Sequence, residues 1–162
     1  MDYLELFDYF KKARAKLVES LEKLTNEEFT KNRGLSFDSI KDVITHTIMV
    51  EDNWLHYRYA GLGAGTDRKF QEFKNITDVK SYMSEVDDKT AKLFQKLAEA
   101  DLQKPVKRPL PNGGVTVYSL ENVLYHVPIE IIYHYGEIFA EFWKMNIDAP
   151  YYSYLGYSEQ RA

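Results

Sequence analysis

The amino-acid sequence predicts an all-α protein, a four-helix bundle with a small β-ribbon in the connection before the last helix. Three observations lead to this prediction. Apolar residues recur at helical spacing through four long segments. Glycine and proline clusters separate these segments. Before the last segment, NGG at 112–114 forms a hairpin-type turn between the short runs VKRPL and VTVYS.

The first half of the chain contains two of the predicted helices. The first covers residues 2–24, where leucine and phenylalanine recur at helical spacing. Thr25 then opens TNEEF, a Thr-x-x-Glu capping box that predicts a short helical turn. The second helix is predicted from near Ser36 to about Ala60. The segment GLGAG at 61–65 ends it, and because it follows a helix rather than a strand, it lacks the context of a phosphate-binding loop.

The second half contains the other two predicted helices. The third begins at Thr77-Asp78 and is predicted to reach about Ala100, before prolines prevent its continuation. Ser119 caps the fourth and most apolar helix, in which Pro128 is expected to introduce a kink. The last segment, NIDAPYYSYLGYSEQRA, has no helical period and is expected to pack over the bundle or a partner subunit. The long connections permit crossovers between helices as well as simple up-and-down order.

Length and charge restrict the classes of function. A chain of 162 residues suits a single domain over residues 1–162 with its own core. A net charge of -4 gives no attraction to phosphate backbones, so no nucleic-acid partner is expected. No apolar run approaches the roughly 18–20 residues that cross a bilayer, and the N-terminus lacks a secretory signal, so we expect no membrane partner and a cytoplasmic location.

The absence of cysteine also restricts the chemistry. It excludes disulfides, cysteine-ligated zinc, iron–sulfur clusters and cysteine nucleophiles. A bound metal must therefore be held by histidine, carboxylate or backbone oxygen. Thiol chemistry would need a thiol from outside the protein.

A candidate metal site follows from histidine spacing. Glu130 and His134 are four residues apart in the fourth helix and therefore project from one face, about 6 Å apart along its axis. His126 lies a further four residues back, about 12 Å from His134, so one ion can use either 126/130 or 130/134. His46 supplies a third ligand if the second and fourth helices are neighbours at matched levels.

Two non-metal interpretations compete with this site. A histidine on an apolar face is often a hydrogen-bonded core residue, and an i,i+4 Glu–His pair is often a helix-surface contact. Glu130 favours the metal, since it lies between Ile129 and Ile131 and a buried carboxylate needs a partner, a proton or an ion. His56 is expected instead to interact with a helix C-terminus.

Two short motifs are similar to those of a known family. They are HTIMVEDNW at 46–54 and EIIYHYGE at 130–137, the latter preceded by LYH at 124–126. With these motifs and its helix count, the chain resembles the DinB-like (YfiT-like) superfamily of metal-dependent enzymes. The likeness covers essentially the whole chain.

The resemblance implies a four-helix bundle of up-down-down-up order, often dimeric, with a three-histidine site for nickel, zinc or a similar divalent ion. Some relatives are thiol-dependent S-transferases or isomerases that use bacillithiol, mycothiol or related thiols. His46 and His134 match two of the three family ligands. Glu130 stands where the family has the third histidine, and Glu137 stands where it has glutamine.

This departure leaves three possibilities. Two histidines and one carboxylate still bind a divalent ion and favour Fe(II) or Mn more than three imidazoles do, so nickel, zinc, iron and manganese are all candidates. His126 is an alternative nitrogen ligand beside Glu130. The chain is otherwise a relative that has lost its metal.

Two hypotheses of function follow. The first is a metal-dependent enzyme, a thiol S-transferase or hydrolase acting on a small molecule, with a low-molecular-weight thiol as one possible substrate and Glu137 as the candidate base. The second is a non-catalytic dimeric helical bundle that binds a small molecule or partner and has a degenerate metal site. A homodimer is expected in either case.

Overall fold

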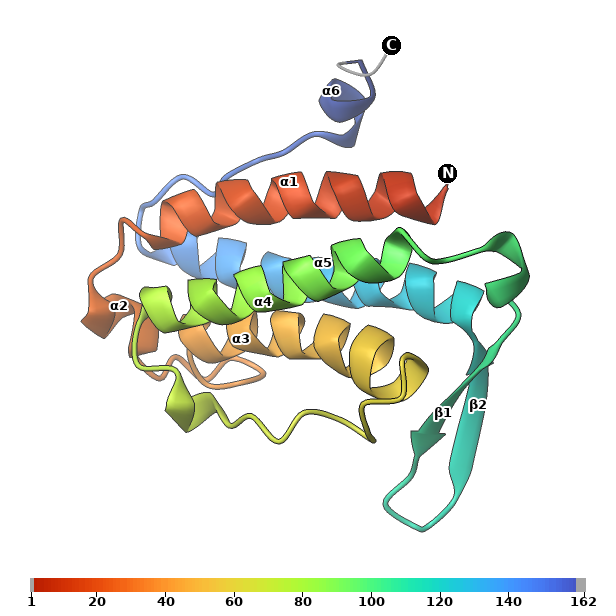
Figure 1. Ribbon diagram of the computed structural model, residues 1–162. Helices are drawn as coiled ribbons and strands as arrows, with labels where there is room; N and C mark the ends of the chain where they lie inside the picture. The colour runs from red at the N-terminus through yellow and green to blue at the C-terminus, as the bar shows by residue number, and fades with distance from the viewer. Residues whose placement is uncertain (1, 160–162) are drawn as a thin grey trace.

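The computed structural model describes residues 2–159 and confirms the predicted all-α bundle. The four long helices are α1 (Tyr3–Leu21), α3 (Ile40–Glu51), α4 (Ile76–Phe94) and α5 (Leu120–Lys144). In Figure 1, α1 and α5 run in one direction while α3 and α4 run in the other. This is the up-down-down-up order, and it makes α3 and α5 antiparallel neighbours.

Short elements join and extend the bundle. The capping box at Thr25 is confirmed, since its side chain accepts from the Glu28 N–H. The elements are α2 (Asn26–Thr30), the π-helix η1 (Asp52–Tyr59), the 3-10 turns η2 (Phe70–Glu72) and η3 (Glu99–Asp101), and α6 (Tyr154–Glu159).

The second predicted helix ends where expected, near Ala60, but it begins later and its last part is a π-helix. It begins at Ile40 rather than near Ser36, because Ser39 is the N-cap and accepts from the Asp42 N–H. The preceding chain makes a turn in which Asp38 has a φ of 65°. Toward the C-terminal end, α3 widens into η1, where the Ala60 N–H bonds to the Leu55 carbonyl five residues back.

The third helix is shorter than predicted, and the fourth begins where predicted. α4 ends at Phe94 rather than near Ala100, and a 3-10 turn replaces its last part. α5 begins after the Ser119 cap, as predicted, and continues through Pro128 to Lys144.

The β-ribbon is confirmed. Strands β1 (Pro105–Pro109) and β2 (Val115–Ser119) pair antiparallel, with Lys107 opposite Val117. Gly113 has a φ of 82° in the turn between them, a conformation that favours glycine. Successive side chains on a strand point to opposite faces. Val106 is fully buried, so its face of the ribbon is the one that packs on the bundle.

The core lies between the four long helices. Each fully buried Leu or Ile side chain contributes about 1.5–3 kcal/mol. The residues with no exposed surface include Leu17, Leu21, Ile44, Ile48, Val86, Leu124, Ile138 and Phe142. None of the helices described within residues 2–159 is long and apolar enough to cross a membrane.

The C-terminal segment packs over the bundle and, although its sequence has no helical period, it contains α6; its residues 160–162 lie outside the described residues. α6 lies on the outer side of α1 (Figure 1). The Tyr157 hydroxyl lies 2.8 Å from a carboxylate oxygen of Asp8, and the Tyr9 hydroxyl donates to the Tyr152 carbonyl at 2.7 Å. Aromatic contacts with α1 thus stabilise a six-residue helix whose sequence has no clear apolar period.

Candidate metal centre

Neighbouring helices bring His46, Glu130 and His134 together. One ligand atom from each residue lies within 4.8 Å of the others, and all three side chains are partly buried. The imidazole centroids of His46 and His134 are 4.8 Å apart, with the rings at 80° to each other. The levels of α3 and α5 therefore match as the candidate site requires.

The separations are close to those of a metal site. Nitrogen and oxygen ligands bind divalent ions at about 2.0–2.2 Å, so ligand atoms around one ion lie roughly 3–3.5 Å apart. The ligand atoms of the trio lie up to 4.8 Å apart. They would have to approach one another by up to about 1.5 Å to bind one ion. Rotation of the partly exposed Glu130 side chain allows this approach, so the three residues fit a divalent ion.

Glu137 fixes the orientation of His134. The Nδ1 atom of His134 is 2.8 Å from Glu137 Oε1, while its Nε2 atom faces Glu130 Oε1 at 3.8 Å. Ser36 holds the same carboxylate, donating from its backbone N–H at 3.0 Å and from its hydroxyl at 2.8 Å. With Nδ1–H donating to Glu137, the Nε2 lone pair points to the centre of the trio.

The hydrogen bonds also keep Glu137 ionised. Burial would raise the pKa of its carboxyl, but the bonds from Ser36 and His134 outweigh burial and lower it. The carboxylate therefore remains an acceptor for the His134 N–H.

Phe37 covers the imidazole of His46. The two rings stack with centroids 3.8 Å apart, and the Phe37 ring is 5.5 Å from that of His134. Burial, together with the nearby His134, lowers the pKa of His46 to about 4. His46 is thus neutral at neutral pH, the form that a metal ion requires of an imidazole ligand.

Glu130 is not buried, so the argument for a metal from its burial was wrong. Its side chain is 38% exposed, and the adjacent Ile129 is 50% exposed. α5 carries apolar residues on its outer face as well as on its core face, and apolar neighbours in the sequence therefore did not indicate an interior position. The carboxylate lies at the solvent side of the trio, where it can meet an ion and a substrate.

His126 faces Glu130 from the opposite side. Its Nε2 atom is 3.9 Å from Glu130 Oε2, and its ring packs against Trp54 with centroids 5.4 Å apart. His126 does not belong to the converging trio. The Glu130 carboxylate therefore lies between two imidazoles, and the structure brings His134 rather than His126 close to His46.

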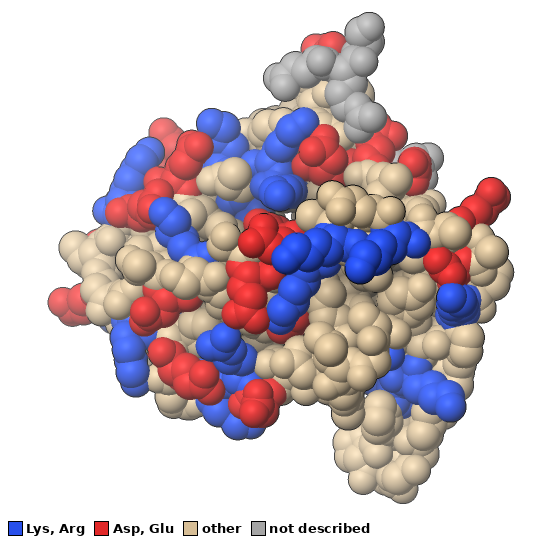
Figure 2. Space-filling model, in the orientation of Figure 1, with Lys and Arg blue, Asp and Glu red and all other residues tan. Residues whose placement is uncertain are grey.

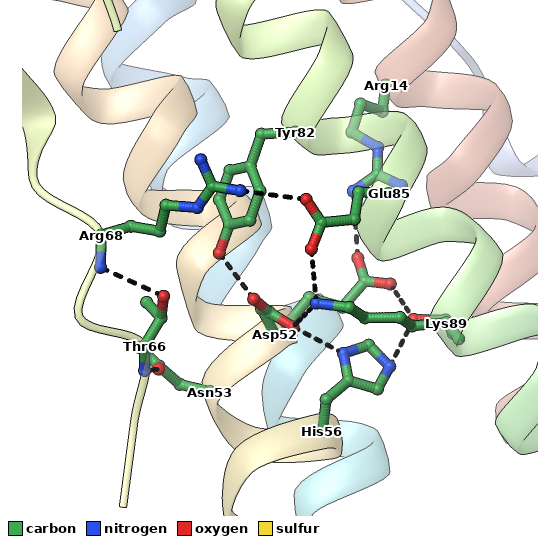
Figure 3. Close-up of polar contacts among 11 residues, drawn as sticks. Arg14, Asp52, Asn53, His56, Thr66, Arg68, Tyr82, Glu85 and Lys89 are labelled. Atoms are coloured by element: carbon green, nitrogen blue, oxygen red, sulfur yellow. Dashed lines mark hydrogen bonds and ion pairs between the residues drawn. The ribbon is translucent and has the colours of Figure 1, made fainter. Parts of the chain in front are cut away.

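A second polar cluster, which the sequence did not predict, lies inside the bundle (Figure 3). Its main ion pairs are those of Arg14, which is 5% exposed and binds Glu51 at 3.0 Å and Asp87. Thr90 donates to the second oxygen of Glu51 at 2.6 Å. Burial raises the pKa of Asp87, although Arg14 acts in the opposite direction.

The same cluster contains His56, which lies in the last turn of η1, near a helix C-terminus as expected. The π-helical turn directs His56 inward, where it is 3% exposed and its Nδ1 lies 2.8 Å from Asp52 Oδ1. The Tyr82 hydroxyl donates to Asp52 Oδ2 at 2.8 Å, and Lys89 binds Oδ1 at 3.3 Å. We refer to Arg14, Glu51, Asp52, His56, Tyr82, Asp87, Lys89 and Thr90 as the buried network.

The comparisons with known proteins agree with this architecture. The family model described as "DinB family" matches residues 1–145. A crystal structure of a DinB-like protein from Bacillus cereus ATCC 10987 is similar to this chain with a TM-score of 0.68 at 12% sequence identity. The alignment covers 91% of this chain and 95% of that one. The comparison with curated proteins found no match.

Proposed function

The chain belongs to the DinB family, and we propose that it is a metal-dependent enzyme acting on a small molecule, as a thiol S-transferase or a hydrolase. His46, Glu130 and His134 would hold the ion. The observation that carries the proposal is the convergence of their three ligand atoms, from two different helices, within 4.8 Å. Nickel, zinc, iron and manganese are all compatible with two imidazoles and one carboxylate.

The chemistry follows from an incomplete coordination shell. A divalent ion held by His46, Glu130 and His134 would polarise an electrophile or lower the pKa of a bound water or thiol. Because the chain has no cysteine, a thiol substrate would be a separate molecule. Glu130, at the solvent side of the trio, is the protein ligand nearest to an incoming substrate.

We assign Glu137 a positioning role in place of the role of general base that the sequence suggested. Its Oε1 atom accepts from His134 and from the Ser36 hydroxyl, and its Oε2 atom accepts from the Ser36 N–H. A carboxylate engaged in this way orients His134 and raises its basicity as a ligand. It is poorly placed to take a proton from a substrate.

Metal analysis of untagged protein tests the proposal. We expect stoichiometric metal in the wild type and a lower melting temperature after chelation, because an ion that binds only the folded state stabilises it. His46→Ala and His134→Ala should lose the metal. His126→Ala is the matched control and should keep it. A wild type with no stoichiometric metal and an unchanged melting temperature on chelation would contradict the proposal.

The alternative function is a dimeric, non-catalytic bundle with a degenerate site. One observation favours it: α5 exposes several large apolar side chains, Ile129, Ile132, Tyr133 and Trp143. Such a surface is typical of an interface between subunits. Light scattering on purified protein measures the oligomeric state. Metal that is bound by the wild type and lost in both His46→Ala and Glu130→Ala would contradict a degenerate site.

A further inference from the structure

A pocket of about 330 Å³ lies beside the metal centre, where η1, the β-ribbon and the start of α5 meet. Its lining residues are Trp54, Arg108, Tyr118, Asn122, Val123 and His126. We propose that this pocket binds the carboxylate or phosphate group of the substrate, whose other end reaches the metal centre. The inference rests on the proposed function, because it assigns a substrate class to that site.

Two arginines near the pocket, Arg58 and Arg108, form no ion pair with an acidic residue of the described chain. The guanidinium carbon of Arg58 lies 4.8 Å over the Trp54 ring, and the Arg58 Nε atom is buried without a hydrogen-bond partner. Arg108 lines the same pocket. Within residues 2–159, neither guanidinium forms an ion pair with a carboxylate.

The two charges are also close enough to affect each other. Burial, followed by the positive charge of Arg108, lowers the pKa of Arg58. An oxyanion between the two side chains would relieve this repulsion and give Arg58 the acceptor that it lacks. Guanidinium groups match the geometry of carboxylate and phosphate oxygens through paired N–H donors.

The β-ribbon directs Arg108 to the side of the pocket. Arg108 shares a face with the buried Val106, which pairs with Tyr118. Lys107 is on the opposite face, away from the pocket. Over the ribbon, Figure 2 shows blue side chains with no red ones beside them. Arg108 therefore brings a positive charge to the pocket side of the ribbon.

The N-terminus of α5 is not an alternative source of donors. The Leu120 and Glu121 N–H groups donate to the Lys104 and Leu102 carbonyls, and the Asn122 N–H donates to the Ser119 hydroxyl. These groups are already satisfied. Arg108, which also hydrogen-bonds Tyr118, and Arg58 are thus the cationic donors near the pocket.

The pocket and the metal centre adjoin each other at His126. His126 contacts Trp54 on the pocket side and lies 3.9 Å from Glu130 on the other side. A molecule anchored at Arg108 therefore needs to extend only past one imidazole to reach the trio. The volume is at the lower end of the roughly 300–1,000 Å³ of ligand pockets, which fits a small acid.

Fluorescence of Trp54 tests the inference. The chain has two tryptophans, and Trp143 is 65% exposed, so Trp143→Phe leaves Trp54 as the reporter inside the pocket. Benzoate and phenyl phosphate are the charged probes, and benzamide is the neutral control. In the Trp143→Phe background, Arg108→Met should weaken binding of a charged probe by about tenfold. Lys107→Met, on the opposite face of β1, should leave it unchanged.

The expected result is a saturable change in emission with at least one charged probe and none with benzamide. Equal binding of benzamide, no saturable binding of either anion, or an unchanged affinity in Arg108→Met would overturn the inference. The titrations are made without added metal. A protein that binds the anion but holds no metal would contradict the proposed function alone, whereas one that holds metal but binds neither anion would contradict the inference alone.

Discussion

The acid–histidine pairs Asp52–His56 and Glu130–His134 have the same i,i+4 spacing and different surroundings. Asp52 and His56 are 1% and 4% exposed, lie 2.8 Å apart, and have further partners in Tyr82, Lys89 and Thr90. Glu130 and His134 are 38% and 13% exposed, and their facing atoms are 3.8 Å apart, too far for a hydrogen bond. Neighbouring side chains supply hydrogen bonds to the first pair. The second pair instead has ligand atoms that face a common centre with His46.

The comparison shows that spacing alone does not identify a metal site. In the buried network, Tyr82 and Lys89 supply donors to the carboxylate, and the pair contributes to the stability of the fold. In the trio, the one hydrogen bond of His134 goes to Glu137 and orients the ring. We expect substitutions in the network to alter mainly the free energy of unfolding, and substitutions around the trio to alter mainly metal affinity.

The largest effect is expected from Arg14→Met. It would leave Glu51 and Asp87 buried without their cation, and removing one partner of a buried ion pair costs about 3–5 kcal/mol. Denaturant unfolding measures the change. Lys12→Met on the exposed side of α1 is the control and should change stability little. If folded Arg14→Met lost metal affinity but kept its stability, the buried network would act on metal binding rather than on the stability of the fold, contrary to this comparison.

Asp52→Asn should have a smaller, pH-dependent effect. Burial would raise the pKa of Asp52, but hydrogen bonds from His56 and Tyr82 outweigh it and lower the pKa below 3.8. A lowered pKa stabilises the folded state above the unfolded-state pKa, and this contribution is lost as the pH falls through the folded-state pKa. The variant should be less stable by about 1–3 kcal/mol at neutral pH. The difference should shrink as the pH falls below 3.8; a pH-independent difference would contradict this account.

Glu137→Ala should leave the fold intact and weaken metal binding. Removing a carboxylate that orients a histidine ligand typically costs about 10–100-fold in metal affinity. Competition with a chelator measures the affinity. Glu137→Gln keeps a hydrogen-bond acceptor and should recover part of the loss, whereas equal losses in both variants would mean that Glu137 does not act through its bond to His134.

The smallest effect is expected at the C-terminal segment. Tyr157→Phe removes the hydroxyl that lies 2.8 Å from Asp8, and should reduce stability by about 1 kcal/mol without affecting metal affinity. Thermal unfolding and metal titration on the same sample separate the two quantities. A reduced metal affinity would show that the segment is coupled to the trio.

Local pattern predicted the features that depend on residues near each other in the chain. The helices, the ribbon turn and the shared face of Glu130 and His134 follow from periodicity and spacing. The pairing with His46 needed helices α3 and α5 to be neighbours at matched levels, which the family resemblance suggested and the structure shows. The predicted burial of Glu130 was wrong because apolar residues occupy both faces of α5.

The features that could not be predicted depend on distant contacts. Glu51 lies 37 residues from Arg14 and 39 from Thr90, so no local pattern links Glu51 to these partners. Ser36 reaches Glu137 across 101 residues, and it does so because the turn at Asp38 replaces the first part of the predicted helix.

The central claim is that the trio, and not the buried network, binds a divalent ion. Anomalous diffraction at the absorption edge of the metal found in the purified protein tests it most directly. The account predicts one peak within bonding distance of imidazole nitrogens of His46 and His134 and of a Glu130 carboxylate oxygen. No peak at that position, or a peak bound by Asp52 and His56 instead, would contradict it.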